Sequence, residues 1–109
     1  LNKRLQHPVP MRRFRMNVIV EGIPAFAEDN MDVLANEYVE LLQVTSAERC
    51  VMITTDQITG ERPPNNILKV LGEYRRRPAD LKFASGLLFG NYMTVAREGV
   101  LRVGDRLRF

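Results

Sequence analysis

Turn-forming residues divide this chain into short segments and leave a single stretch with clear helical periodicity. Glycine, proline and asparagine recur between runs of valine, isoleucine, threonine and aromatic residues, and this spacing is typical of β-sandwiches and barrels. Ile67, Leu71 and Tyr74 repeat at helical spacing, which predicts one helix over residues 67–74 that ends before Pro78. The sequence therefore predicts a β-dominated fold, all-β or α+β, with one packed helix.

Polar residues mark both ends of this expected helix. Asn65 or Asn66 is suited to cap its N-terminus, because an amide oxygen can accept a backbone N–H there. Arg75, Arg76 and Arg77 follow at the other end. They complement the helix dipole, and they form either a solvated cationic end or an anion site.

The apolar, β-branched runs predict about five or six strands in a barrel-like sheet. The expected strands are residues 17–20, 37–45, the run that starts at Cys50, residues 87–96, and residues 100–109 around a Gly104-Asp105 turn or bulge. Residues 1–16 are expected to form an ordered but irregular arm. Turns, or a single helical turn, are expected over residues 25–30 and 56–60.

Length and composition place the chain among ordinary globular proteins. Its 109 residues are 45% hydrophobic and 27% charged, which suits a single domain over residues 1–109. No window approaches the roughly 18 apolar residues of a membrane span, so no membrane association is expected. The lone cysteine, without a signal segment, indicates the cytoplasm. The first residue is Leu1, which favours an origin as a piece of a longer protein.

The residue inventory excludes several function classes. A structural zinc site needs about four ligands, whereas the chain has only Cys50 and His7. No glycine-rich phosphate loop occurs, and His7 lies beside Pro8 in the irregular arm, where it is poorly suited to act as a base for Cys50. The low aromatic content, 7%, argues against a nucleic-acid platform.

Arginine dominates the positive charge of the chain. It outnumbers lysine thirteen to three, within a net charge of +3. Because a guanidinium fork suits phosphate and carboxylate groups, an anionic partner is plausible. The alternative is a solvated surface of mixed charge, since so small a net charge steers ligands weakly.

Cys50 follows Arg49 at the start of an expected strand, and this position has two interpretations. An unpaired cysteine often packs as a small, buried hydrophobic residue. Alternatively, the cation beside it favours the thiolate, which attacks electrophiles and binds soft metals. One thiolate is enough for molybdenum in a pterin dithiolene cofactor, because the pterin supplies two sulfurs and arginine forks can hold its phosphate.

Five segments of the chain together match a known family at matching spacing. These segments are Phe14-Arg15-Met16-Asn17-Val18-Ile19-Val20-Glu21-Gly22, Ala25-Phe26-Ala27-Glu28-Asp29, Glu48-Arg49-Cys50-Val51-Met52-Ile53-Thr54-Thr55-Asp56 with Thr59-Gly60, Leu88-Phe89-Gly90, and Val100-Leu101-Arg102-Val103-Gly104-Asp105. Through them the chain resembles, over residues 1–108 in order, the C-terminal part of the MOSC domain, a β-rich domain of molybdenum cofactor sulfurases, amidoxime-reducing components and their bacterial relatives.

The resemblance implies a set of site residues. Cys50 would be the catalytic cysteine and the molybdenum ligand, as the second cysteine of the family's Cys-x-Arg-Cys pattern. Arg15 and Asn17 match the Phe-Arg-Pro-Asn segment that helps to hold the pterin, and their i,i+2 spacing would place both on one face of an extended segment. Arg49, next to the thiol, is expected to contact the cofactor as well.

Three residues depart from the family pattern. Ala47 replaces the first cysteine of Cys-x-Arg-Cys, and Met16 replaces the proline of Phe-Arg-Pro-Asn. Glu48 brings a carboxylate next to the site, where it would repel an anionic cofactor. The expected metal ligand, Cys50, is retained.

The resemblance further implies a molybdenum-cofactor oxidoreductase that reduces N-hydroxylated substrates. Its expected partners are an N-terminal β-barrel module of the same protein, which these residues lack, and a reductase or iron-sulfur electron donor. Pyridoxal phosphate would occur only on a separate domain of sulfurase relatives. The alternative function is a sulfur carrier that holds a persulfide on Cys50 for delivery to a molybdenum enzyme.

Overall fold

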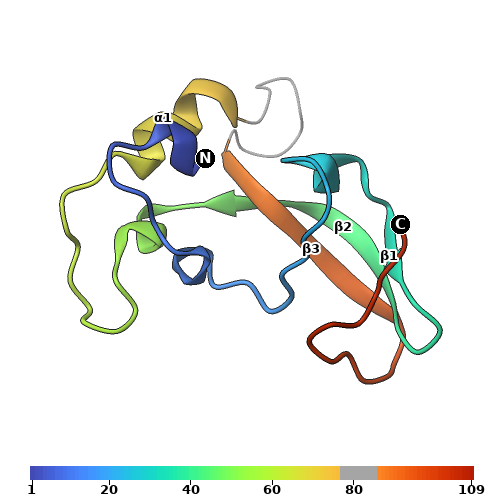
Figure 1. The fold of residues 1–109 in the computed structure, drawn as a ribbon. Helices are drawn as coiled ribbons and strands as arrows, with labels where there is room; N and C mark the ends of the chain where they lie inside the picture. Colours follow the sequence, from blue (N-terminus) through green and yellow to red (C-terminus); the bar gives the residue numbers. More distant parts are fainter. Residues whose placement is uncertain (77–85) are drawn as a thin grey trace. The chain divides into compact units, whose positions relative to one another are not determined.

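The structure is a computed structural model that describes residues 1–76 and 86–109 (Figure 1). Its regular elements are one helix and three strands with four short 3-10 turns. In chain order they are η1 (Asn2–Arg4), η2 (Met11–Phe14), η3 (Ala27–Asn30), β1 (Val33–Ala35), β2 (Glu40–Arg49), η4 (Val51–Thr54), α1 (Ile67–Tyr74) and β3 (Leu87–Arg97). The β-dominated prediction with one packed helix is therefore confirmed.

The three strands form one sheet in the order β1-β2-β3. β1 and β2 are antiparallel, with Leu34 opposite Leu41. The loop between them is closed by Asn36, whose Oδ1 accepts hydrogen bonds from the backbone N–H groups of Tyr38 and Val39 at 2.8 and 2.9 Å. This side-chain turn explains why the second strand begins at Glu40, three residues after its predicted start.

The chain divides into two compact units. The first comprises residues 1–21 and 48–89, and the second comprises residues 22–47 and 90–109. This division into compact units does not test the expectation of a single domain over residues 1–109, which stays a prediction.

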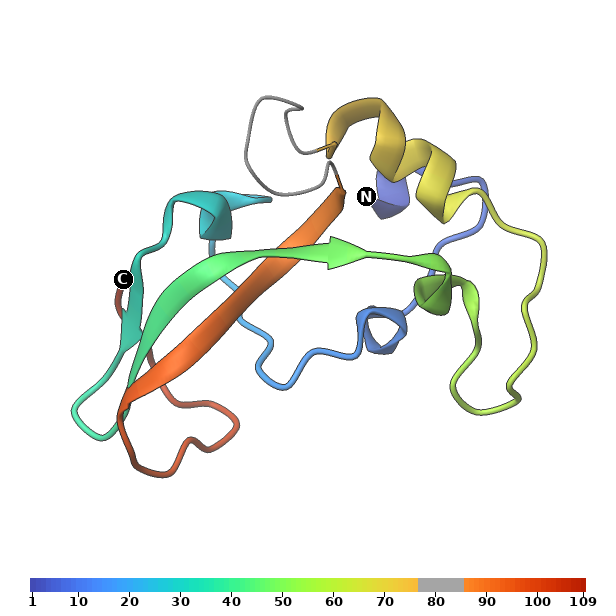
Figure 2. The same ribbon diagram turned by 180° about the vertical axis from the view of Figure 1, so that it is seen from behind.

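A hydrophobic core in the first unit forms around α1. Ile67 and Leu71, one helical turn apart, are fully buried, and Val70 lies beside them. They pack with Leu5, Phe14 and Ile53, which places η2 and η4 against the same core. Both views show these two turns next to each other (Figures 1 and 2). The apolar residues at helical spacing thus form one face of α1, and η2 and η4, which are distant in sequence, pack against it.

The second unit has a smaller core at the β1–β2 hairpin. Its buried apolar residues are Met31, Leu34, Ala35, Val39 and Ala47. Asn91 ties β3 to η3 within this unit, because its Nδ2 donates to the carbonyl of Glu28 at 2.5 Å.

Several predicted elements are confirmed. The helix spans Ile67–Tyr74 as expected, and Asn65 Oδ1 accepts the Ile67 N–H at its N-terminus. At its other end the Arg75 Nε donates to the carbonyl of Leu88, which links the helix end to β3. Arg77 and Pro78 lie outside the described residues. The strand predicted over residues 87–96 is β3, and the turns at residues 27–30 and 56–60 are present.

The prediction of a strand over residues 17–20 is wrong. Val18, Ile19 and Val20 are 43, 60 and 37% exposed and belong to none of the three strands. β-branched side chains favour an extended backbone, but a strand also needs a ladder partner, and the described residues supply none here. The described part contains a three-stranded sheet that is not a closed barrel, so the expected barrel-like form stays a prediction.

The strand predicted from Cys50 onward is also wrong. β2 ends at Arg49, and Val51–Thr54 forms the 3-10 turn η4. The alternation predicted after residue 100 likewise gives no strand. It gives a turn at Gly104, whose φ is 95°, followed by one isolated bridge between Ala35 and Arg108.

Candidate functional site

Cys50 lies at the junction of β2 and η4 and is exposed. Its backbone is extended, with φ −125° and ψ −171°, and its carbonyl accepts the Ile53 N–H at 3.3 Å to begin the 3-10 turn. The interpretation of Cys50 as a buried thiol is therefore wrong, and its reactivity stays a prediction. The structure presents the sulfur to solvent from a backbone fixed on both sides.

The turn after Cys50 forms because one of its residues enters the core. Ile53 is buried against the helix, whereas Val51 and Met52 are exposed. The Thr54 hydroxyl donates to the carbonyl of Val51 at 2.6 Å and closes the turn. An alternating strand would have placed Val51 and Ile53 on the same face and buried both. Because Ile53 is buried and Val51 is not, the burial pattern favours the turn.

Arg49, the last residue of β2 and the neighbour of Cys50, is bonded to two distant segments. Its Nε donates to the carbonyl of Phe89 at 2.8 Å, and its Nη1 donates to the carbonyl of Phe14 at 3.0 Å. Its Nη2 donates to the Met16 sulfur at 3.3 Å. The rings of Phe14 and Phe89 stack with centroids 3.9 Å apart. Each guanidinium nitrogen thus has a protein acceptor, and Arg49 acts as a structural clamp in this arrangement.

Arg15 follows η2 in the left-handed region, with φ 57° and ψ 39°, and is exposed. Asn17 is exposed two residues later, at a bend. The expectation that both lie on one extended segment is wrong, because Arg15 terminates a 3-10 turn by donating its N–H to the carbonyl of Arg12 at 3.1 Å. The Arg49 clamp nevertheless brings this segment to the end of β2 that precedes Cys50, since its acceptors Phe14 and Met16 flank Arg15.

The Glu48 side chain packs beside Gly86, and its expected repulsion of an anionic cofactor stays a prediction. Its side chain covers Gly86, where an added Cβ would overlap the Glu48 carboxyl carbon. The absence of a side chain at residue 86 thus leaves room for this carboxylate beside the chain that enters β3. The packing directs the Glu48 carboxylate to a backbone position that only glycine leaves open.

Arg13 and Asp56 form an ion pair that the sequence did not predict. Arg13 is only 6% exposed; its Nη1 donates to the carbonyl of Thr54 at 3.1 Å, and its Nη2 lies 3.4 Å from Asp56 Oδ2. The turn at residues 56–60 was expected, but its partner 43 residues earlier in the chain has no local sequence signal. A buried guanidinium requires such partners to offset its lost hydration.

The pKa of Asp56 is lowered from its ordinary value. The main cause is the pair of backbone N–H groups of Ile58 and Thr59, which donate to its Oδ1 at 2.8 and 3.2 Å. The positive charges of Arg13 and Arg12 contribute further. The carboxylate is therefore held ionised and oriented toward Arg13.

No group of three or more His, Cys, Asp or Glu side chains among residues 1–76 and 86–109 is arranged to hold a metal ion.

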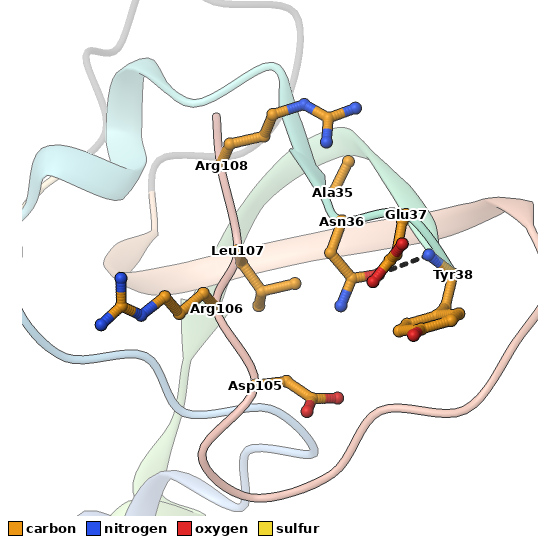
Figure 3. A pocket seen from close by; sticks show the side chains of 8 residues that line it. All are labelled: Ala35, Asn36, Glu37, Tyr38, Asp105, Arg106, Leu107 and Arg108. Atoms are coloured by element: carbon orange, nitrogen blue, oxygen red, sulfur yellow. Dashed lines mark hydrogen bonds between the residues drawn. The ribbon is translucent and has the colours of Figure 1, made fainter.

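A pocket of about 380 Å³ lies elsewhere, within the second unit, between the β1–β2 loop and residues 105–108 (Figure 3). Its lining mixes the carboxylates of Glu37 and Asp105 with the cations of Arg106 and Arg108. The Arg106 side chain extends away from Asn36 and Tyr38. This pocket contains none of the expected site residues.

Comparison with known proteins bears on the residues just described. The family model for the MOSC domain matches residues 1–108. This chain belongs to the MOSC domain family. Within the described part of this MOSC chain, no helix is long and apolar enough to cross a membrane.

Curated relatives of this MOSC chain are amidoxime-reducing components. The chain is 43% identical to the mitochondrial amidoxime reducing component 2 of Rattus norvegicus, over 96% of this chain and 32% of the rat protein. It is 36% identical to the mitochondrial amidoxime-reducing component 1 of Homo sapiens, with the same coverage, and 35% identical to component 1 of Xenopus laevis, over 96% of this chain and 31% of that protein. The chain thus spans about a third of the length of these relatives.

The departures from the MOSC pattern now have a structural account. Ala47 is 1% exposed, so its small side chain fills a packed position, while Cys50 three residues later is exposed. Met16, in place of proline, supplies the sulfur that accepts from Arg49. Both departures leave the exposed thiol of Cys50 in place.

Proposed function

We propose that this MOSC chain supplies Cys50 as the single protein ligand to molybdenum in a pterin cofactor. The parent protein would be an oxidoreductase that reduces N-hydroxylated substrates. The observation that carries the proposal is an exposed cysteine on a fixed, extended backbone, in a chain 43% identical to a protein named for amidoxime reduction.

The donor set fits such a cofactor better than a metal held by the protein alone. One exposed thiolate is a soft ligand, and the described residues offer no cluster of further ligands beside it. When bound, the cofactor would supply two further sulfurs and the redox chemistry of molybdenum. The task of Cys50 is to hold the metal at a fixed place on the protein surface.

Arg15 and Asn17 are the proposed contacts to the anionic part of the cofactor. Both side chains are exposed, and Arg15 follows a backbone segment that the Arg49 clamp holds against the end of β2, next to Cys50. A guanidinium can hold a phosphate through two parallel hydrogen bonds. Replacing Arg15 with lysine should therefore lower cofactor retention in the parent protein, although the charge is kept.

The proposal extends to the partners expected from the sequence. The relatives are about three times as long as this chain, which leaves room for the N-terminal β-barrel module of the same protein. The exposed run at residues 18–20, which has no ladder partner in the described part of the chain, is suited to pair with such a neighbouring segment. A reductase or iron-sulfur protein would supply electrons.

The test uses the parent protein, expressed in a host that makes the molybdenum cofactor. Cys50→Ala should lower molybdenum content and abolish reduction of an amidoxime, with an unchanged far-ultraviolet circular dichroism spectrum. Val51→Ala is the matched control, because Val51 is the adjacent exposed residue, and it should keep both. Normal metal content and turnover in Cys50→Ala would overturn the proposal.

The sulfur-carrier alternative gives a different result in the same experiment. A carrier would gain a persulfide on Cys50 from a donor persulfide, detectable as thiocyanate after cyanide treatment. It would contain no stoichiometric molybdenum and would not reduce the amidoxime. Stoichiometric metal and pterin that depend on Cys50 favour the ligand role over the carrier role.

A further inference from the structure

Cys50 and Arg15 belong to two segments that are fastened to each other by two arginines. Arg49 forms the first link, from the residue before Cys50 to the carbonyl and the sulfur on either side of Arg15. This link holds the Arg15 segment to the end of β2. A separate link holds the same segment to η4.

Arg13 forms the second link, and it runs in the opposite direction. It projects from η2, two residues before Arg15, and its Nη1 donates to the carbonyl of Thr54, the last residue of η4. Its Nη2 reaches Asp56 beyond the turn. Cys50 thus lies between Arg49 and Thr54, each of which is bonded to the segment that carries Arg15.

Among the described residues, Arg13 is the one charged side chain that is buried. Burial of a guanidinium costs hydration that an apolar side chain of similar volume would not lose, so packing alone does not account for an arginine here. Its geometry does have a directional consequence, because the two nitrogens of one planar fork contact η4 and the following turn together.

We propose that Arg13 and Asp56 are positioning residues that hold Arg15 beside Cys50. This inference rests on the proposed function, because it assigns the pair the task of aligning an anion-binding guanidinium with the metal-binding thiol. Neither residue needs to touch the cofactor.

Asp56 is suited to this task because its own position is fixed. Its Oδ1 accepts the Ile58 and Thr59 N–H groups, while its Oδ2 faces Arg13. The Asp56→Asn substitution retains an oxygen for the turn and removes the charge that orients Arg13. It therefore separates the ion pair from the turn in which it lies.

The experiment measures alkylation of Cys50 in the 109-residue chain at low ionic strength. Cys50 is its only thiol, so the rate constants report on one site. Each variant is treated with iodoacetamide, which is neutral, and with iodoacetate, which is anionic. A cation held within about 6 Å of the sulfur should raise the iodoacetate-to-iodoacetamide ratio about threefold.

Arg15→Gln should lower this ratio by about that factor. Asp56→Asn and Arg13→Lys should lower it in the same direction, with circular dichroism spectra like that of the unmodified chain. The direction of the change distinguishes the two effects of Asp56→Asn. Loss of its negative charge alone would raise the iodoacetate-to-iodoacetamide ratio, whereas displacement of Arg15 from the sulfur would lower it. Glu61→Gln, which removes an exposed carboxylate five residues away, is the matched control and should leave the ratio unchanged or slightly raised.

An unchanged or raised ratio in both Asp56→Asn and Arg13→Lys would overturn the inference. So would an unchanged ratio in Arg15→Gln, since Arg15 would then not lie beside the sulfur. The assay needs no cofactor. A lowered ratio combined with normal molybdenum content in Cys50→Ala of the parent would refute the proposed function alone.

Discussion

Replacement of Arg49 should destabilise the fold, because its guanidinium serves three acceptors on two other segments. The bonds run to the carbonyls of Phe89 and Phe14 at 2.8 and 3.0 Å and to the sulfur of Met16 at 3.3 Å. Arg49→Ala leaves both carbonyls without this donor. Each loss should cost about 1 kcal/mol at a half-buried site, and lost packing of the aliphatic stem adds about 1 kcal/mol more.

The expected fall in the free energy of unfolding is therefore about 3 kcal/mol. In a domain of this size it corresponds to a fall in melting temperature of roughly 10–20 °C. Lysine keeps the charge but not the planar fork, so Arg49→Lys should lose about half as much. Urea unfolding followed by circular dichroism measures the free energy of unfolding of the unmodified chain, Arg49→Ala and Arg49→Lys.

Arg106→Ala is the matched control, because Arg106 is exposed on the second unit and should change stability by less than about 0.5 kcal/mol. If the free energy of unfolding of Arg49→Ala lies within about 0.5 kcal/mol of that of the unmodified chain, the three hydrogen bonds of Arg49 do not stabilise the fold, contrary to the prediction. If Arg49→Lys in the parent then loses molybdenum at full stability, Arg49 contacts the cofactor, as its sequence position first indicated.

Three further predictions concern the core, the pH response and the isolated chain. Leu71→Ala should lower the free energy of unfolding by about 3 kcal/mol, because Leu71 is fully buried. A fall of less than about 1 kcal/mol, measured by urea titration, would contradict the packing described. The pKa of Asp56 is lowered on folding, so its stabilisation is complete above its unfolded pKa of about 3.9 and is lost as pH falls through the lower folded value. Asp56→Asn should flatten the acid side of the stability profile, and a profile parallel to that of the unmodified chain would refute this. The isolated 109-residue chain should fold cooperatively, copurify with little molybdenum and show rapid native alkylation of Cys50, since cofactor pockets occur preferentially between domains. Stoichiometric metal and pterin in the purified chain would instead show a complete site within these residues.

The local periodicity of the sequence determined the elements that depend on near neighbours. Ile67 and Leu71 are four residues apart, and any helix over this stretch places them on one face. The polar turn at residues 56–60 likewise depends on Asp56 and the N–H groups that follow it. Such elements were predicted correctly because their stabilising contacts lie within a few residues.

The tertiary structure decided whether a β-branched run became a strand. Residues 18–20 and 50–54 have the same propensity for an extended backbone, yet neither run is a strand of the sheet. The first lacks a ladder partner among the described residues, and the second turns because Ile53 enters the core around α1. Propensity is a property of the run itself, whereas pairing and burial depend on what packs against it.

The candidate site divides along the same line. The sequence alone identified Cys50, Arg15 and Asn17 by the resemblance of their segments, and only the fold showed Cys50 to be exposed. The roles of Arg49 and Arg13 could not be predicted, since their acceptors lie 33 to 43 residues away in the chain. An arginine in a sequence has a charge and a reach, and its partners exist only once distant backbone carbonyls are folded within that reach.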